Sequence, residues 1–248
     1  MPQRACALTF DDGWQDNFEH AFPVLQRHTA PATIFLVSGM TGTAAEFWPN
    51  RLARRLAGLR PDEELPDPLG RLLAPVIERA RGLGAWGLQD LDRAVILSKQ
   101  LGDEQMRTLL DQAAVGAVPT PASRAVLNED ELQIMAASGL VRFGSHTRTH
   151  RRFRDDLPPE ALEQEIVGSR AEIARSVGTA GIGVFCYPNG DTTPAAVGTV
   201  RKHYDAAVTT RRGWHRAGMD PFLIRRIGVH EDISNRPAAF LARISGLL

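Results

Sequence analysis

Short apolar segments alternate with amphipathic helical segments along most of this chain, and this alternation limits the possible folds more than any other feature. A strand expected at residues 5–10 is followed by a helix at 15–28 and a β-branched strand at 31–37. A strand, a helix and a strand at this spacing indicate a βαβ unit, whose strands pair in parallel through a right-handed crossover. The order returns later, with further strands expected at 140–143, 183–187, 206–210 and 223–229. The repeated order predicts a barrel-like or open α/β domain.

Residues from about 41 to 124 differ from the rest, because Arg-, Leu- and Ala-rich helical segments replace the alternation of strands and helices. This composition predicts a helical insertion or subdomain. The chain has 248 residues, of which 43% are hydrophobic, so it is long enough for one large α/β domain or two small ones. We expect a single catalytic domain over residues 1–248 that contains this insertion.

The first strand ends abruptly at two adjacent acids in the stretch Thr9-Phe10-Asp11-Asp12-Gly13. In α/β folds the carboxyl ends of the strands assemble the functional site. An Asp-Gly pair after a strand is also a common turn, so this stretch alone leaves both interpretations open.

Two histidines supply the second cluster, since His146 and His150 stand four residues apart just after a predicted strand. On a helical turn two imidazoles at this spacing share a face and can bind one metal ion, although they could also be surface histidines in an Arg-rich segment. Adding Asp12 completes a set of three ligands, which leaves an open position for water on Zn²⁺. Asp11 would then remain free to act as the general base.

Other metalloenzyme classes fit this pattern less well. The segment His-Thr-Arg-Thr-His lacks the glutamate that follows the first histidine of a zinc protease helix, which excludes that class. Two histidines and a carboxylate could form the facial triad of a non-haem iron oxygenase. We rank this alternative below hydrolysis, because that triad usually occurs in an all-β jelly roll.

Charge and composition restrict the partners and the compartment. Lys plus Arg and Asp plus Glu number 29 each, so the net charge predicts no affinity for nucleic acid or an anionic membrane. No apolar run approaches the ~18 residues of a membrane helix, and the N-terminus lacks the pattern of a secretory leader, so we expect a cytoplasmic protein without membrane insertion. Cys6 and Cys186 lie in apolar runs and are expected to be buried free thiols.

The combination of Thr-Phe-Asp-Asp-Gly with a later His-Thr-x-x-His pair resembles the first two motifs of the polysaccharide deacetylase family, the NodB-homology or carbohydrate esterase family 4 enzymes. The resemblance extends from Leu8 to about His230, apart from the helical insertion. It implies a distorted (β/α) barrel that removes N-acetyl groups from the amino sugars of a polysaccharide, an oligosaccharide or a glycan precursor. It also implies a divalent metal, Zn²⁺ with Co²⁺ or Ni²⁺ as alternatives. The ligands would be Asp12, His146 and His150, and the base would be Asp11.

The segment Phe185-Cys-Tyr-Pro188-Asn-Gly190 is similar to the third family motif, which commonly reads Arg-Pro-Pro-Tyr-Gly. By this match the backbone N–H of Asn189 would donate to the developing oxyanion. Cys186 occupies the position of the arginine that usually orients the catalytic aspartate. Either Arg225 or Arg226 substitutes for it from a neighbouring strand, or the base is less well held.

His230 lies roughly where the family has Leu-x-His, and the resemblance implies that it protonates the leaving amine; a solvated histidine is the alternative. Trp14, Trp48 and Trp214 could stack on sugar rings, but tryptophans more often pack in a core. The missing arginine of the third motif also raises a rival function, a carbohydrate-binding protein that kept the metal site and lost turnover.

Overall fold

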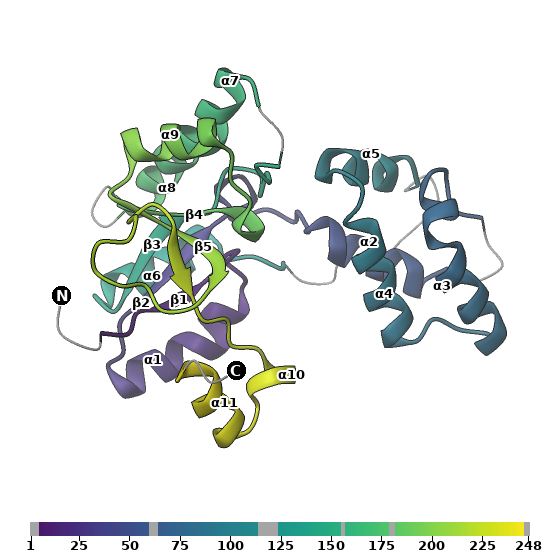
Figure 1. Ribbon diagram of the computed structural model, residues 1–248, viewed down its shortest axis with the longest axis horizontal. Helices are drawn as coiled ribbons and strands as arrows, with labels where there is room; N and C mark the ends of the chain where they lie inside the picture. Colours follow the sequence, from purple (N-terminus) through teal and green to yellow (C-terminus); the bar gives the residue numbers. More distant parts are fainter. Residues whose placement is uncertain (1–4, 60–63, 114–123, 155–156, 179–181, 246–248) are drawn as a thin grey trace. The chain divides into compact units, whose positions relative to one another are not determined.

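The computed structural model describes residues 5–59, 64–113, 124–154, 157–178 and 182–245 (Figure 1). The chain divides into two compact units, one formed by Met1–Thr43 and Arg124–Leu248 and the other by Ala44–Ser123. The second unit corresponds to the helical insertion that the sequence places at about residues 41–124.

The first unit is built on a six-stranded sheet in the order β1-β2-β3-β4-β5-β6, and every described pairing between neighbours is parallel. The strands are β1 (Leu8–Phe10), β2 (Ala32–Leu36), β3 (Val141–Ser145), β4 (Val184–Cys186), β5 (Ala206–Arg212) and β6 (Ile224–Arg226). The sheet curls into a half-barrel, which confirms the distorted (β/α) barrel of the NodB-homology type.

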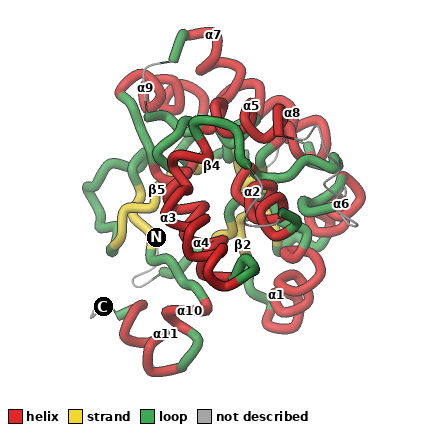
Figure 2. The backbone as a smooth tube through the Cα atoms, turned by 90° about the vertical axis from the view of Figure 1, so that its right-hand side faces the viewer, coloured by secondary structure: helices red, strands yellow, loops and turns green. Residues whose placement is uncertain are grey.

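Helices lie between the strands and cover the sheet; Figure 2 draws them in red and the strands in yellow. They are α1 (Phe22–His28), α6 (Glu129–Ala137), α7 (Pro159–Leu162), α8 (Ser169–Val177) and α9 (Pro194–His203). Two more helices, α10 (Glu231–Ser234) and α11 (Pro237–Ile244), follow the last strand. Two short 3₁₀ turns, η2 (Ser38–Met40) and η4 (Pro188–Gly190), follow β2 and β4. Strand residues such as Ile34, Phe143 and Phe185 are buried against these helices in one core.

The strand register brings the ends of β2, β3 and β4 to one edge of the sheet. Ser145, the last residue of β3, pairs with Leu36 at the end of β2 and with Phe185 in β4. Because parallel strands end at the same edge, the residues that follow them are brought together there.

Two of the expected helices contain π-helical turns. The helix expected at 15–28 begins as a π-helical segment, η1 (Asn17–Ala21), and continues as α1, where Pro23 sits in the first turn. The long helix expected from 158 to 177 consists of α7, a π-helical segment η3 (Glu163–Gly168) and α8.

The second unit contains four helices within its described residues: α2 (Trp48–Ala57), α3 (Leu69–Leu83), α4 (Leu88–Ser98) and α5 (Asp103–Ala113). Its own core includes Leu52, Leu73 and Met106. Trp48 is buried there and donates its indole N–H to Asp103 across 3.0 Å, so its role is packing within this unit.

Two expectations from composition have different outcomes. No helix in the described part of the chain is long and apolar enough to cross a membrane. Both cysteines are free, and Cys186 is buried as expected, but Cys6 is exposed. The prediction for Cys6 was wrong because β1 begins only at Leu8, so Cys6 lies outside the sheet.

Candidate metal centre

The two acids of the first motif lie at the carboxyl end of β1, where the chain turns sharply. Asp12 and Gly13 both adopt φ of 72°, a left-handed conformation that aspartate tolerates better than most residues. A side chain at Gly13 would place its Cβ 2.7 Å from the Leu36 Cδ2 atom, so glycine lets this turn pack against β2. The turn directs the two neighbouring carboxylates to different partners.

His146 and His150 follow β3 in an irregular loop, not on a helical turn as the sequence suggested. Thr147 and His150 have φ of 65° and 60°, and two left-handed residues are incompatible with a helix. The loop nevertheless brings the imidazoles together, with ring centroids 5.0 Å apart. The two histidines do lie close together as expected, but the prediction that a helical turn brings them together was wrong.

Three potential ligands converge in this loop and the β1 turn. The Nε2 atoms of His146 and His150 each lie 3.4 Å from Oδ1 of Asp12. One ligand atom from each residue falls within 4.8 Å of the other two, a separation that a single metal ion could bridge. Two imidazole nitrogens and a carboxylate oxygen are a common ligand set for Zn²⁺.

The hydrogen bonds around these residues suit a metal ion. Nδ1 of His146 lies 2.8 Å from the carbonyl oxygen of Cys186, which can only accept, so Nδ1 must carry the proton and Nε2 is left to bind a cation. Trp14 donates its indole N–H to Oδ2 of Asp12 across 3.0 Å and leaves Oδ1 facing the histidines. The first tryptophan therefore orients a carboxylate in this structure.

The same contacts shift the pKa values of the candidate ligands. Burial raises the pKa of Asp12, but the neighbouring His146, His150 and Trp14 outweigh it and hold that pKa below its usual value. Burial lowers the pKa of His146, but Cys186 and the two aspartates raise it well above its usual range. The surroundings of His146 therefore favour a positive charge at its imidazole.

Asp11 is held by a side chain from the far edge of the sheet, Arg226 at the end of β6. Nη1 and Nη2 of Arg226 donate to Oδ1 and Oδ2 of Asp11 across 2.6 and 2.7 Å. The remaining donations go to the Thr209 carbonyl oxygen at 2.9 Å, Thr9 Oγ1 at 3.2 Å and Cys186 Sγ at 3.4 Å. All five N–H bonds of the guanidinium are thereby used, so its position is fixed by acceptors on or next to three other strands, β1, β4 and β5.

This geometry answers the question raised by Cys186. Of the two arginines proposed to replace the usual one, Arg226 pairs with Asp11, whereas Arg225 is exposed. Burial raises the pKa of Asp11, but the hydrogen bonds and charge of Arg226, with the charge of His146, hold it below its usual value. Asp11 is therefore ionised at neutral pH.

Asn189 and His230, the two other predicted site residues, lie on segments that leave the same edge of the sheet. Asn189 is exposed in η4, three residues after the Cys186 carbonyl that bonds His146, and has φ of 54°. His230 is exposed before α10, and its described hydrogen bonds join its backbone to Ile233 and Ser234. Among the contacts described for it, none links His230 to Asp11 or the three ligands.

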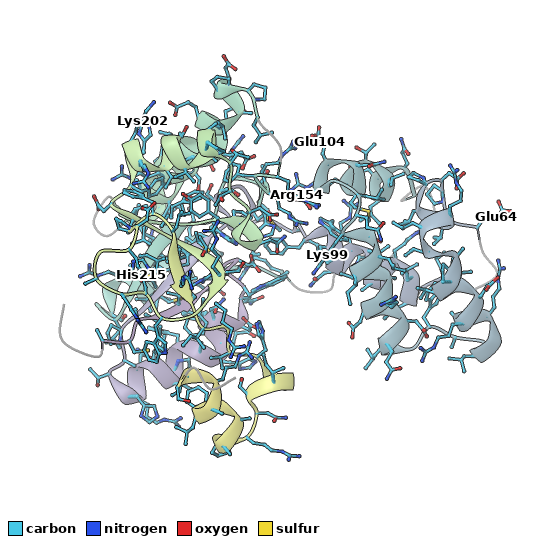
Figure 3. All side chains as sticks on the ribbon, viewed as in Figure 1. Glu64, Lys99, Glu104, Arg154, Lys202 and His215 are labelled. Atoms are coloured by element: carbon cyan, nitrogen blue, oxygen red, sulfur yellow. The ribbon has the colours of Figure 1, made fainter. Side chains whose placement is uncertain are left out.

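Trp214, the last of the three tryptophans considered for sugar stacking, is 53% exposed in the segment between β5 and β6. It precedes His215, which is labelled in Figure 3. No described contact links Trp214 to the candidate metal ligands. Its suggested stacking on a sugar therefore remains a prediction.

The fold and this cluster define a class: a curled parallel α/β half-barrel with a candidate metal centre at its strand ends. A sequence model of the polysaccharide deacetylase family matches residues 1–62 and 101–206, more than half of the chain. The chain belongs to the polysaccharide deacetylase family. The matched residues include Asp11, Asp12 and both histidines, whereas Arg226 and His230 lie beyond them.

Among curated proteins, the putative polysaccharide deacetylase YxkH of Bacillus subtilis (strain 168) is 45% identical to this chain over 42 residues. The alignment spans 16% of this chain and only 15% of that relative. It is therefore a local similarity.

Solved structures show the fold more broadly. The putative polysaccharide deacetylase BA0330 from Bacillus anthracis has a TM-score of 0.57 and 17% identity, over 96% of this chain and 50% of that one. The Streptococcus pyogenes deacetylase PplD, in complex with acetate, has a TM-score of 0.59 and 16% identity, over 98% and 72%. IcaB from Ammonifex degensii has a TM-score of 0.56 and 20% identity, over 96% of this chain and 72% of that one. The chain thus spans half of the Bacillus anthracis structure.

Proposed function

We propose that this chain is a metal-dependent hydrolase that removes N-acetyl groups from the amino sugars of a polysaccharide, an oligosaccharide or a glycan precursor. The observation that carries the proposal is the convergence of His146, His150 and Asp12 beside a second carboxylate, Asp11, that has a separate partner. Membership of the polysaccharide deacetylase family supports this reaction class.

The three converging residues would hold a divalent cation, which we propose to be Zn²⁺, with Co²⁺ or Ni²⁺ as alternatives. When bound, such a cation polarises a carbonyl group and lowers the pKa of a water molecule. His146 would bind through Nε2, because its Nδ1 donates to Cys186, and Asp12 would bind through Oδ1, because its Oδ2 accepts from Trp14.

Asp11 serves as the general base. Its carboxylate is ionised and fixed by Arg226, so it can accept a proton as the water oxygen adds to the amide carbon. When the carbon–nitrogen bond breaks, that electron pair goes to nitrogen, and a proton delivered to the nitrogen completes the free amine. The products are acetate and the deacetylated sugar.

Asn189 and His230 complete the proposed mechanism. The backbone N–H of Asn189, in the turn after β4, donates to the oxyanion that develops on the former carbonyl oxygen. His230 protonates the leaving amine. Its exposed position four residues after Arg226 supports this role, since the same segment reaches Asp11 through Arg226.

Acetate release tests the proposal directly. Protein loaded with Zn²⁺, Co²⁺ or Ni²⁺ is incubated with N-acetylglucosamine oligomers, and free acetate and oligomer binding are measured separately. We expect acetate release that a chelator abolishes and that returned metal restores. Binding without acetate release would favour the carbohydrate-binding rival, and turnover only with Fe(II) and O₂ would favour an oxygenase.

A further inference from the structure

Residues 146–150, which we call the ligand loop, connect the two histidines in a conformation that their own sequence does not favour. Thr147 is β-branched, and both it and His150 have left-handed φ values. Such backbone persists only where the surrounding structure fixes it. The contacts that fix the ligand loop therefore also decide where His150 points.

The carbonyl side of the ligand loop is held by the segment after β2. The backbone N–H of Ser38 donates to the Thr147 carbonyl at 3.2 Å, and that of Gly39 donates to the Arg148 carbonyl at 2.8 Å. A Cβ at Gly39 would lie 2.7 Å from the Arg148 oxygen, so the close approach requires glycine. These bonds are between backbone groups and do not depend on any side chain.

The N–H side of the ligand loop is held by one carboxylate, Glu165. Its Oε2 accepts from the backbone N–H groups of Arg148 at 3.0 Å and Thr149 at 2.9 Å, and its Oε1 accepts the Thr149 hydroxyl at 2.7 Å. The Glu165 carbonyl oxygen also accepts from the Arg148 N–H at 3.1 Å. Bonds to a charged acceptor are stronger than neutral ones, so this carboxylate is a strong restraint on the residues directly before His150.

Glu165 is itself held rigidly, because it lies in the π-helical segment η3 just before two anchored residues, Ile166 and Ser169. Ile166 is completely buried in the core. Ser169, at the start of α8, shares a 2.6 Å hydrogen bond with Ser145, the residue immediately before His146. The helix is thus tied to the strand that begins the ligand loop as well as to the loop, and π-helical turns of this kind are frequent at functional sites.

We propose that Glu165 is a positioning residue that places His150 for metal binding. This inference rests on the proposed function only in taking His150 to be a metal ligand. Glu165 does not contact the metal ligands' imidazoles in any described hydrogen bond; it acts through the backbone of Arg148 and Thr149.

Two other glutamates on the same helix provide matched controls. Glu163, also in η3, is exposed and contacts His203 only at 4.0 Å. Glu172 binds the side chains of Arg148 at 2.8 Å and Ser38 at 2.6 Å, and not the loop backbone. Substituting each with alanine removes one carboxylate from the helix without removing the acceptors of the loop N–H groups.

The decisive measurement is the Zn²⁺ dissociation constant of the full chain, obtained by competition with a chromophoric chelator. We expect Glu165→Ala to raise this constant about 10–100-fold, as loss of groups that orient metal ligands typically does. Glu165→Gln keeps one acceptor oxygen and should give a smaller change. Glu163→Ala should leave the constant within about twofold, as for other surface substitutions.

Folding and local order are measured on the same variants without metal. Circular dichroism and thermal unfolding show whether Glu165→Ala remains folded, and amide hydrogen exchange should show faster exchange at Arg148 and Thr149 in that variant. Unchanged exchange, or Zn²⁺ affinity equal to wild type, would overturn the inference. If wild type binds Zn²⁺ and Glu165→Ala binds it more weakly, yet no acetate is released by wild type, the proposed function fails while the positioning role stands. A wild type that binds no metal would overturn both.

Discussion

Asp11 and Asp12 are adjacent in sequence, yet different parts of the molecule hold them. Asp12 is oriented locally, by the indole of Trp14 two positions along the chain. Asp11 is oriented by Arg226, which stands 215 residues away on the opposite edge strand of the sheet. The position of the proposed base therefore depends on contacts across the whole sheet, whereas the position of the proposed metal-binding carboxylate depends on one turn.

The difference implies that the two functions can be disturbed separately. Changes on the Asp12 side should alter metal affinity first, and turnover only as a consequence. Changes on the Asp11 side should alter turnover while metal affinity stays constant. Measuring Zn²⁺ affinity and turnover on each variant tests whether the two functions are separate.

The largest effect is expected from His146→Ala, on the metal side. His146 is buried, and both of its ring nitrogens have partners, so its loss removes a ligand and leaves the Cys186 carbonyl without its donor. We expect the Zn²⁺ dissociation constant to rise more than about a hundredfold and metal-supported acetate release to disappear. Retained Zn²⁺ affinity in this variant would remove His146 from the ligand set.

The next largest effect is expected from Asp11→Asn, on the base side. The amide keeps the shape of the carboxylate but cannot accept the proton of the attacking water. We expect kcat/KM for acetate release to fall about 10²–10⁴-fold, the range for loss of a general base. Zn²⁺ affinity should change little. A parallel loss of Zn²⁺ affinity would mean that the two carboxylates do not have separate roles.

Arg226→Ala tests whether the far edge of the sheet controls the base. Without the guanidinium, Asp11 loses both of its described charge-assisted hydrogen bonds and its fixed orientation. We expect kcat/KM to fall about 10–100-fold, because a small misplacement of a reacting group costs this much. Zn²⁺ affinity should stay close to that of wild type.

Two comparisons distinguish a loss of Asp11 orientation from a general loss of structure in Arg226→Ala. Added guanidinium at concentrations below those that unfold the protein should restore part of the activity of Arg226→Ala, and equal concentrations of NaCl should not. Arg225→Ala, which removes the neighbouring exposed arginine, should behave as wild type. If guanidinium restored nothing while the variant remained folded, the guanidinium contact would not be what orients Asp11.

Trp14→Phe probes the local restraint on Asp12 and should have a smaller effect. Phenylalanine keeps most of the ring but removes the N–H that donates to Oδ2. We expect the Zn²⁺ dissociation constant to rise about tenfold, at the low end for groups that orient a ligand. At saturating Zn²⁺, kcat should recover, and a kcat that stayed low would place Trp14 in the chemistry of the reaction.

The sequence predicts the sheet well because β1, β2 and β4 consist mainly of apolar residues. It points to the candidate ligands Asp12, His146 and His150 because they follow the strands β1 and β3. It does not predict the conformation of the ligand loop, because spacing alone favours a helical turn, whereas the left-handed residues are held by contacts from the segment after β2 and from Glu165. It also cannot choose between Arg225 and Arg226. Neighbouring residues on a strand point to opposite faces, so a one-residue difference in register decides which arginine reaches Asp11.

The smallest effect is expected from Asn189→Gly, which tests how the turn after β4 contributes. Asn189 has φ of 54°, a conformation that glycine adopts at least as readily, so the backbone should keep its shape. If the backbone N–H is the oxyanion donor, the substitution leaves it in place, and kcat/KM should remain within about threefold of wild type. A loss of about 10²–10³-fold would instead assign the donation to the side-chain amide. Either result would show whether Asn189 contributes through its backbone N–H or through its side chain. Backbone groups hold the carbonyl side of the ligand loop, whereas a side chain holds Asp11.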